Sequence, residues 1–253
     1  MKTSKAWIEH FKSNAKINRI DWLQKPKLTA EERENILSAM RAWQLGETSD
    51  GAHLLKAANR YAKAIGDSYY VEAVELFIKE EQKHGNNLGR YLDEIGEQRL
   101  KKNWADTMFR KVRYYNSSME LWTLAVMTVE SAAQVFYQAL KDATECNLLK
   151  QICRDILIDE AFHIDFQCER FQIIYESKGR LSKHVGFYFY RYFYFAVITL
   201  VWFAYGKTFI AGKNDFRNYQ RKMNFKFNKT IGRLKENIQG EVKPASIVIN
   251  NQK

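Results

Sequence analysis

The chain has 253 residues, of which 46% are hydrophobic, so it is long enough to bury the core of one large domain. It contains only two prolines and twelve glycines, and its long stretches rich in Ala, Leu, Glu and Lys predict an all-α protein. The formal net charge of +11 favours acidic partners or an anionic membrane surface. The basic residues form no known nucleic-acid-binding motif, so nucleic acid is not expected as a partner.

The three cysteines, Cys146, Cys153 and Cys168, are odd in number and include no C-x-x-C pair. Their spacing argues against a disulfide framework and against a zinc or rubredoxin-type site. Residues 1–22 carry scattered charges and no apolar run of signal-peptide length. We therefore expect a cytoplasmic protein.

Four long helices are predicted for residues 29–180, after an amphipathic extension at residues 1–28. The first begins at a capping box formed by Thr29 and Glu32 and ends before Gly66. The predicted helices cover residues 29–65, 67–95, 116–142 and 145–177. About twenty residues separate the second helix from the third, enough to return along the whole bundle as a crossover connection.

Each predicted helix places one glutamate at the middle of its apolar stripe, where residues recur at intervals of three and four. In the second helix Glu81 and His84 both fall on lines that face the core, because seven residues are close to two helical turns. The same spacing places Glu80 with Glu94 on a wetter face. Glu81 is therefore the candidate functional residue, and Glu80 is not.

The full set of such positions has a regular order along the chain. The candidates are Glu47 in the first helix, Glu81 and His84 in the second, Glu130 in the third, and Glu160 and His163 in the fourth. Counted from the turns between antiparallel helices, the four carboxylates lie at about the same height.

Four buried carboxylates need compensation, because each unpaired charge would cost several kcal/mol and repel its neighbours. No Lys or Arg interrupts the stripes near these glutamates. Two divalent metal ions would balance the four charges, with two neutral imidazoles completing the coordination. The alternative is that the glutamates lie at exposed edges and the histidines are hydrogen-bonded core residues. The combination favours a dimetal site.

The order Glu, Glu-x-x-His, Glu, Glu-x-x-His resembles the ferritin-like di-iron carboxylate superfamily over roughly residues 29–177. The resemblance implies a ferritin-like four-helix bundle holding two iron ions, although manganese or mixed Mn/Fe sites use the same ligands. It implies that Glu47, Glu81 and His84 hold mainly one ion, that the other three ligands hold the second, and that glutamates bridge. Asp159 matches a family aspartate that hydrogen-bonds a ligand histidine, and Tyr137 is a second candidate for a supporting contact.

The stretch EEQKHGNNLGRYL, Glu80 to Leu92, is locally similar to soluble acyl-carrier-protein desaturases, although this chain is shorter and lacks other desaturase sequence. The resemblance implies an O2-activating di-iron oxidase that hydroxylates or desaturates a hydrophobic substrate, with an acyl group as one option. It would need O2, an external electron donor and, for an acyl substrate, an acidic carrier protein. No catalytic residue beyond the metal ligands is predicted. The alternatives are a ferroxidase or peroxide-reducing rubrerythrin-like protein and a non-enzymatic metal-stabilised scaffold.

Small and aromatic residues near the predicted site are candidates for the walls of an apolar cavity. They are Trp43, Gly51, Ala133, Phe136 and Tyr137.

Residues 181–238 are predicted to form aromatic-rich and basic helices, followed by a flexible tail at 239–253. The segment 184–206 carries one charge, Arg191, and its uncharged part of about fifteen residues is shorter than the roughly twenty that span a bilayer. Aromatic residues lie at both ends, as at membrane interfaces, and the basic segment that follows suits an anionic leaflet. Two readings stay open: a fifth helix packed on the bundle or forming a homodimer surface, and membrane association through residues 184–210.

Overall fold

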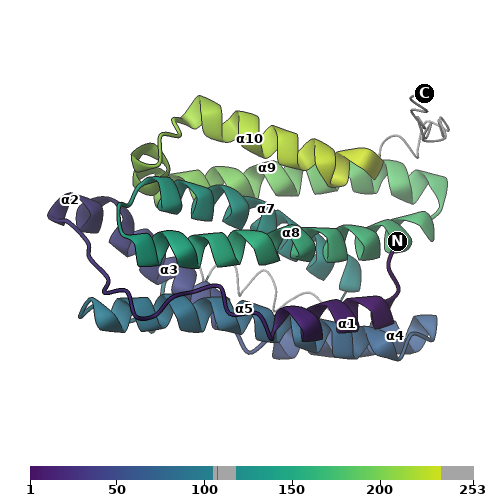
Figure 1. Cartoon of the computed structure of the whole chain (residues 1–253). Coiled ribbons are helices and arrows are strands. Elements are labelled where there is room, and N and C mark those ends of the chain that lie inside the picture. Colours follow the sequence, from purple (N-terminus) through teal and green to yellow (C-terminus); the bar gives the residue numbers. More distant parts are fainter. Residues whose placement is uncertain (105–106, 108–117, 235–253) are drawn as a thin grey trace, which may run out of the picture.

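The computed structural model of the chain describes residues 1–104, 107 and 118–234. All regular structure in these ranges is helical and none of it is β-strand, so the all-α prediction is confirmed. The helices lie in three layers (Figure 1). The first layer contains α1 (Ser4–Asn14), α4 (Ala52–Ile65) and α5 (Tyr69–Glu94), the second α7 (Met119–Asp142) and α8 (Asn147–Glu176), and the third α9 (Arg180–Ala211) and α10 (Phe216–Lys229).

The first predicted helix is broken in two, so its prediction as one helix over 29–65 was wrong. It begins at the expected capping box as α2 (Ala30–Glu32), passes through a π-helical turn (Arg33–Leu37) and continues as α3 (Ser38–Glu47). A loop then leads to Gly51, whose φ of +66° is costly for any residue with a Cβ. The sequence TSDG explains the break, because Thr, Ser and Asp favour turns and caps and Gly accepts the left-handed conformation.

The other three bundle helices lie close to their predicted bounds. α4–α5 and α7–α8 are connected by short turns, and α5 runs antiparallel to α8, since residues 80 and 84 of α5 face residues 163 and 159 of α8. α5 and α7 therefore run parallel, as a crossover between them requires. About half of the predicted crossover, residues 105–106 and 108–115, lies outside the described residues.

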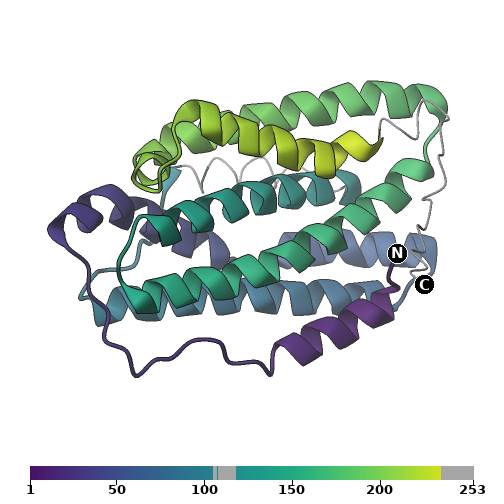
Figure 2. The same ribbon diagram turned by 45° about the horizontal axis from the view of Figure 1, so that its top comes forward.

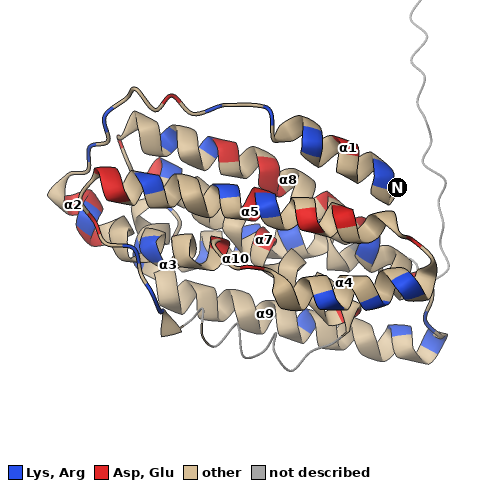
Figure 3. Ribbon diagram, turned by 90° about the horizontal axis from the view of Figure 1, so that it is seen from below, with Lys and Arg blue, Asp and Glu red and all other residues tan. Residues whose placement is uncertain are grey.

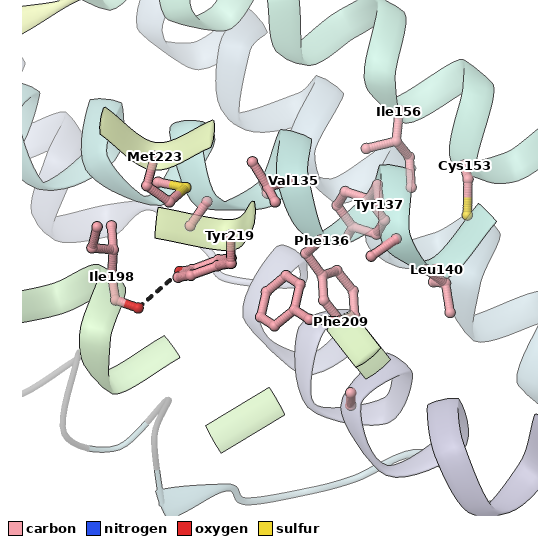
Figure 4. Packing of buried hydrophobic residues seen from close by; sticks show 14 of the residues in the cluster. Val135, Phe136, Tyr137, Leu140, Cys153, Ile156, Ile198, Phe209, Tyr219 and Met223 are labelled. Carbon is pink, nitrogen blue, oxygen red and sulfur yellow. Dashed lines mark hydrogen bonds between the residues drawn. The ribbon is translucent and has the colours of Figure 1, made fainter. Parts of the chain in front are cut away.

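Two apolar clusters fill the interior on either side of the bundle centre. One contains Trp7, Phe77 and Phe166, contributed by α1, α5 and α8. The other joins α7 and α8 to the C-terminal helices, and Figure 4 shows Phe136 facing Phe209 and the Tyr219 hydroxyl donating a hydrogen bond of 2.8 Å to the Ile198 carbonyl. The polar residues at the mid-height of the helices lie between these clusters.

The C-terminal helices cover one side of the bundle (Figure 2). α9 packs on the bundle through Tyr190, Tyr194 and Ile198, which are at most 2% exposed. A kink interrupts it at Tyr205, where φ is −131° and ψ is 17°. Among the described residues α9 is the one helix whose length and apolar composition would suffice to cross a membrane. The predicted flexible tail at 239–253 lies outside the described residues.

Candidate metal centre

The six predicted ligands come from four helices and meet between the two apolar clusters. Glu47 is the last residue of α3, and the others lie within α5, α7 and α8. They form two groups, Glu47/Glu81/His84 and Glu81/Glu130/Glu160/His163. In each group one ligand atom from every residue lies within 4.8 Å of the others. Glu81 is common to both groups, so its carboxylate is placed between two candidate metal positions.

The cluster is almost completely removed from solvent. Glu160, His84 and His163 are fully buried, whereas the Glu81 side chain keeps 19% of its surface exposed. The His163 Nδ1 atom lies 2.7 Å from Glu81 Oε1 and 3.9 Å from Glu130 Oε2, and His84 Nδ1 lies 3.9 Å from Glu81 Oε1. Both imidazoles therefore present Nδ1 to the carboxylates.

Several buried polar atoms of this cluster have no hydrogen-bond partner. They are both carboxylate oxygens of Glu160, Nδ1 of His84, and the pair Glu81 Oε1 and His163 Nδ1, whose 2.7 Å contact lacks hydrogen-bond geometry. Buried polar atoms are normally satisfied, because leaving them unpaired is costly. Carboxylate oxygens and neutral imidazole nitrogens are the ligands that iron and manganese accept. The unsatisfied atoms therefore fit a pair of metal ions.

The pKa values within the cluster show how closely its carboxylates are packed. Burial, followed by the charge of Glu81, raises the pKa of Glu47 well above its ordinary value. Burial and the charge of Glu130 do the same to the pKa of Glu160. Burial would lower the pKa of His163, but Glu81 and the other carboxylates outweigh it and raise that pKa well above 6.5. Bound cations would relieve this repulsion.

A reciprocal pair of carboxylates holds the far side of the two histidines. Asp159 Oδ2 lies 3.0 Å from His84 Nε2, and Glu80 Oε2 lies 2.9 Å from His163 Nε2. Each of these carboxylates immediately precedes a ligand glutamate on its own helix and contacts the histidine of the opposite helix. Such contacts fix the ring orientation and direct Nδ1 toward a metal. Asp159 thus contacts a candidate ligand histidine, the role that the family resemblance implies.

The prediction that Glu80 lies on a wetter face was wrong, because α1 covers that face. Glu80 is only 5% exposed, and the Asn14 side-chain amide donates to Glu80 Oε1 at 2.5 Å and to Asp159 Oδ1 at 2.8 Å. Burial opposes ionisation of Glu80, but the contact with His163 and the Asn14 hydrogen bond lower its pKa. Asn14 therefore connects the two carboxylates that hold the histidines.

Two basic side chains, Arg19 and Lys83, also contact Asp159, and sequence reasoning missed both of them. Arg19 Nη1 lies 2.8 Å from Asp155 Oδ1 and 3.1 Å from Asp159 Oδ1. Lys83 Nζ lies 2.6 Å from Asp159 Oδ2 and 3.3 Å from Asp155 Oδ2. Burial opposes ionisation of Asp159, but its contacts with His84, Lys83 and Asn14 outweigh burial and lower the pKa of this carboxyl. One sign of these supporting contacts was present in the sequence: an acidic residue, Glu80 or Asp159, stands directly before each Glu-x-x-His.

Tyr137 supports the carboxylate of Glu47. Its hydroxyl donates a hydrogen bond of 2.5 Å to Glu47 Oε1, and its side chain is fully buried. Burial, and then the charge of Glu47, raise the pKa of Tyr137 well above 10, so the hydroxyl keeps its proton. Tyr137 therefore contacts a candidate ligand rather than a metal position.

A cavity of about 320 Å³ adjoins the cluster, a size in the range of small-molecule sites. Three ligands, Glu47, Glu81 and Glu130, contribute to its wall. The remaining lining is mainly apolar and includes Trp43, Gly51, Leu54, Phe77, Ile78, Trp122, Val126, Val129, Ala133, Val201 and Tyr205, with Asp50 and His53 among the polar residues.

Two of the five predicted lining residues do not line this cavity. Trp43, Gly51 and Ala133 do. Phe136 instead stacks on the ring of Trp43, with centroids 4.6 Å apart and an interplanar angle of 12°. The Tyr137 hydroxyl is hydrogen-bonded to Glu47. The α7 positions follow the helix period, and only the Ala133 side of the helix faces the cavity.

Comparisons with known proteins find similarity at the level of structure. No protein-family model matches the chain, and no curated protein matches it. A point variant of R2-like ligand-binding oxidase with an aerobically reconstituted Mn/Fe cofactor superposes with a TM-score of 0.62 and 18% identity, over 92% of this chain and 94% of that one. The same oxidase without metal cofactor superposes with a TM-score of 0.62 and 18% identity, over 93% and 96%.

These relatives do not support the desaturase part of the sequence resemblance, since their descriptions name an oxidase. They do support the broader resemblance, which is to a ferritin-like fold. At low sequence identity, the chain has the fold of R2-like ligand-binding oxidase, a ferritin-like di-metal carboxylate protein.

Proposed function

We propose that this protein is an O2-activating dimetal oxidase that oxidises an apolar organic substrate held in the cavity beside the metal centre. The observation that carries the proposal is the position of that cavity. Three candidate ligands form part of its wall, and aromatic and aliphatic side chains form most of the rest. A substrate bound there would lie next to the metal ions.

The six clustered residues would hold the ions, with Glu47 and His84 on one, Glu130, Glu160 and His163 on the other, and Glu81 between them. Two ferrous ions, or the Mn/Fe pair named for the structural relatives, would supply the electrons for O2 reduction. Cys146 and Cys153 are buried, and the sequence has no C-x-x-C pair that could pass electrons to the metal centre. We therefore propose that a separate electron donor restores the reduced state.

The protein's own groups would orient the reaction and limit side reactions. His84 and His163 are held by Asp159 and Glu80, so the ligand rings keep one orientation. Tyr137 holds its proton at the oxygen that contacts Glu47. The apolar cavity lining would exclude water once a substrate fills it, which protects a reactive centre from solvent.

The experiment measures O2 consumption by the iron-loaded and the Mn/Fe-loaded protein under a chemical reductant. Straight-chain fatty acids and alcohols of increasing length are added, and products are identified by mass spectrometry. We expect O2 consumption to rise with an apolar compound that fits the cavity, and that compound to gain oxygen or lose hydrogen. Oxidation of ferrous iron or reduction of peroxide, with no effect of any apolar compound, would instead show a ferroxidase or peroxide-reducing protein.

A pair of variants makes this test specific to the cavity. Val126→Phe places a larger side chain in the lining, and we expect it to reduce substrate oxidation while both metals stay bound. Ile158→Phe makes a similar change at a position on α8 that is 43% exposed and is not part of the lining. Equal activity of the two variants would contradict the assignment of the cavity as the substrate site.

A further inference from the structure

The outer face of α9 carries a continuous row of large apolar side chains. Between its first turn and the kink at Tyr205, one side of the helix exposes Leu181, Val185, Tyr188, Phe189, Tyr192, Leu200 and Phe203, each between 42% and 78% exposed. We call these seven residues the α9 stripe. Isolated exposed apolar residues are common, but a row of this length on one helix marks a surface that binds something apolar.

The segment that carries the stripe and continues through α10 is strongly basic. Residues 180–229 contain ten Lys and Arg and a single acidic residue, Asp215, so they carry nine of the eleven net positive charges of the chain. Exposed Arg180 and Arg191 lie on α9 itself. Figure 3 shows acidic residues on α2, α5 and α8, whereas the visible face of α9 is uncharged apart from basic positions.

The opposite face of α9 is committed to the protein interior. Tyr194 is fully buried, and its hydroxyl donates a hydrogen bond of 3.1 Å to the Met223 carbonyl. Tyr190 and Ile198 are buried in the same cluster. To span a bilayer, α9 would have to expose these contacts to lipid. The helix can instead lie flat, with its outer face in the interfacial region and its inner face on the bundle.

We propose that the α9 stripe docks the protein on an anionic lipid surface. An interfacial helix of this kind combines Leu, Phe and Tyr on the lipid side with Lys and Arg near the headgroups. The aromatic side chains suit the boundary between headgroups and acyl chains. The basic residues gain from the negative surface potential of membranes that contain anionic lipids.

A second copy of this chain fits the surface less well. Pairing two α9 stripes about a two-fold axis would bring Arg180 and Arg191 of each copy near the same basic segment of the other. The nine net charges of each segment would then repel, and neither α9 nor α10 offers an acidic side chain within its helix to compensate. Anionic lipid supplies the opposite charge that a second copy lacks.

Docking through α9 would also bring the cavity to the membrane side of the molecule. Val201 and Tyr205, on the inner side of α9, belong to the cavity lining. The docking proposal does not depend on the proposed oxidase activity, because it rests on the exposed residues of α9 and their charge.

The test is sedimentation of the metal-loaded full chain with vesicles of phosphatidylcholine alone and of phosphatidylcholine mixed with phosphatidylglycerol. We expect at least about tenfold tighter partitioning to the anionic vesicles, weakened by added salt. Tyr192→Ser/Phe203→Ser should reduce this partitioning about tenfold or more, because it removes two large apolar contacts. Arg180→Glu/Arg191→Glu should reduce the preference for anionic vesicles.

The matched control is Leu23→Ser, at a position that is 93% exposed and lies before α2. It should bind vesicles like the wild type, and circular dichroism should show that all variants keep their helical content. Equal binding by wild type and the Tyr192/Phe203 variant, or no binding to either vesicle, would overturn the proposal. So would a dimer in gel filtration that this variant converts to a monomer, since the stripe would then be a subunit interface.

Discussion

Gly85 of α5 lies directly against Glu47, the last residue of α3. A Cβ atom at Gly85 would be 3.1 Å from both the carbonyl carbon and the Cβ of Glu47, and 2.7 Å from Cγ2 of Thr48. The absence of a side chain thus lets α3 end at the height of the metal cluster. Gly85, which has no side chain, therefore helps to determine where the candidate ligand Glu47 lies.

Gly85→Ala should displace the end of α3 and weaken metal binding by the Glu47 group. We expect a loss of about 1–3 kcal/mol in the free energy of unfolding, as for other overpacked sites. Gly46→Ala is the control, because a Cβ there has no neighbour within 4 Å, and it should be neutral or stabilising by up to about 1 kcal/mol. Urea unfolding and metal analysis of both variants make the comparison; similar behaviour would contradict the packing role of Gly85.

The shared position of Glu81 predicts unequal effects of ligand removal. Glu81 belongs to both ligand groups, whereas His84 belongs to one. Glu81→Ala should therefore reduce occupancy of both metal positions, and His84→Ala should leave one ion bound. The measurement is metal content per chain after dialysis against a weak chelator. Loss of two ions in both variants would show that the two positions fill only together.

Removal of the metal should destabilise the wild-type protein. Without a bound ion, buried carboxylate oxygens and imidazole nitrogens of the cluster would make no hydrogen bonds, and any ligand that binds only the folded state stabilises it. We expect the melting temperature to fall on chelation and to recover when ferrous iron is added back. A double variant, Glu81→Ala/Glu160→Ala, should show no such response, because it lacks two of the four carboxylates.

The Asn14 amide is expected to matter for metal affinity without touching the metal. Asn14→Ala would remove the donor shared by Glu80 and Asp159, and leaving buried acceptors unpaired costs about 1–3 kcal/mol. We expect metal affinity to fall about 10–100-fold, the range found when supporting contacts of metal ligands are lost. Asn86→Ala, at an exposed position of α5, should change neither quantity. Unchanged affinity in Asn14→Ala would show that α1 only covers the bundle.

Glu32 should make a pH-dependent contribution to stability. Its carboxylate accepts hydrogen bonds from the backbone N–H groups of Thr29 at 2.6 Å and Glu145 at 2.7 Å. Burial would raise the pKa of Glu32, but these two donors outweigh burial and lower it. A lowered folded-state pKa means that the stabilisation is present above the unfolded pKa of about 4.3 and is lost as pH falls through the folded value.

Glu32→Gln tests this contribution. At neutral pH the variant should be less stable than the wild type by about 1 kcal/mol, the usual size of a helix-cap contact. The difference should shrink as the pH falls below about 4. Urea unfolding of both proteins across this range gives the comparison, and a difference that grows in acid would contradict the role of the ionised carboxylate.

The sequence was sufficient for the bundle and its ligand candidates because both depend on helical spacing. Glu47, Glu130 and Glu160 interrupt apolar stripes at matched heights, and the structure brings them together with Glu81. The break after Glu47 was missed, because the heptad pattern of residues 36–65 continues across it. The turn sequence TSDG indicated the break, but this signal was weaker than the apolar periodicity on either side of it.

The residues that hold the ligand histidines were harder to predict, because their contacts join distant segments of the chain. Glu80 looked solvent-facing from the periodicity of α5 alone, and only the position of α1 buries it. Asn14 and Arg19 lie in an extension that gives no sign of its partner. Polar residues at the edge of a helical stripe can be assigned only when the neighbouring element is known, because burial is a property of the assembly.

The bridge from Asn14 to Asp159 also has a consequence for the order of folding. These residues are separated by 145 positions, so α1 is synthesised well before α8 and cannot make this contact until α8 has followed. Contacts of such long range form late, because closing a large loop costs conformational entropy before the contact can stabilise the chain. We expect the amides of α1 to gain hydrogen-exchange protection after those of the α7–α8 hairpin, so that closure of the metal centre is among the last events of folding.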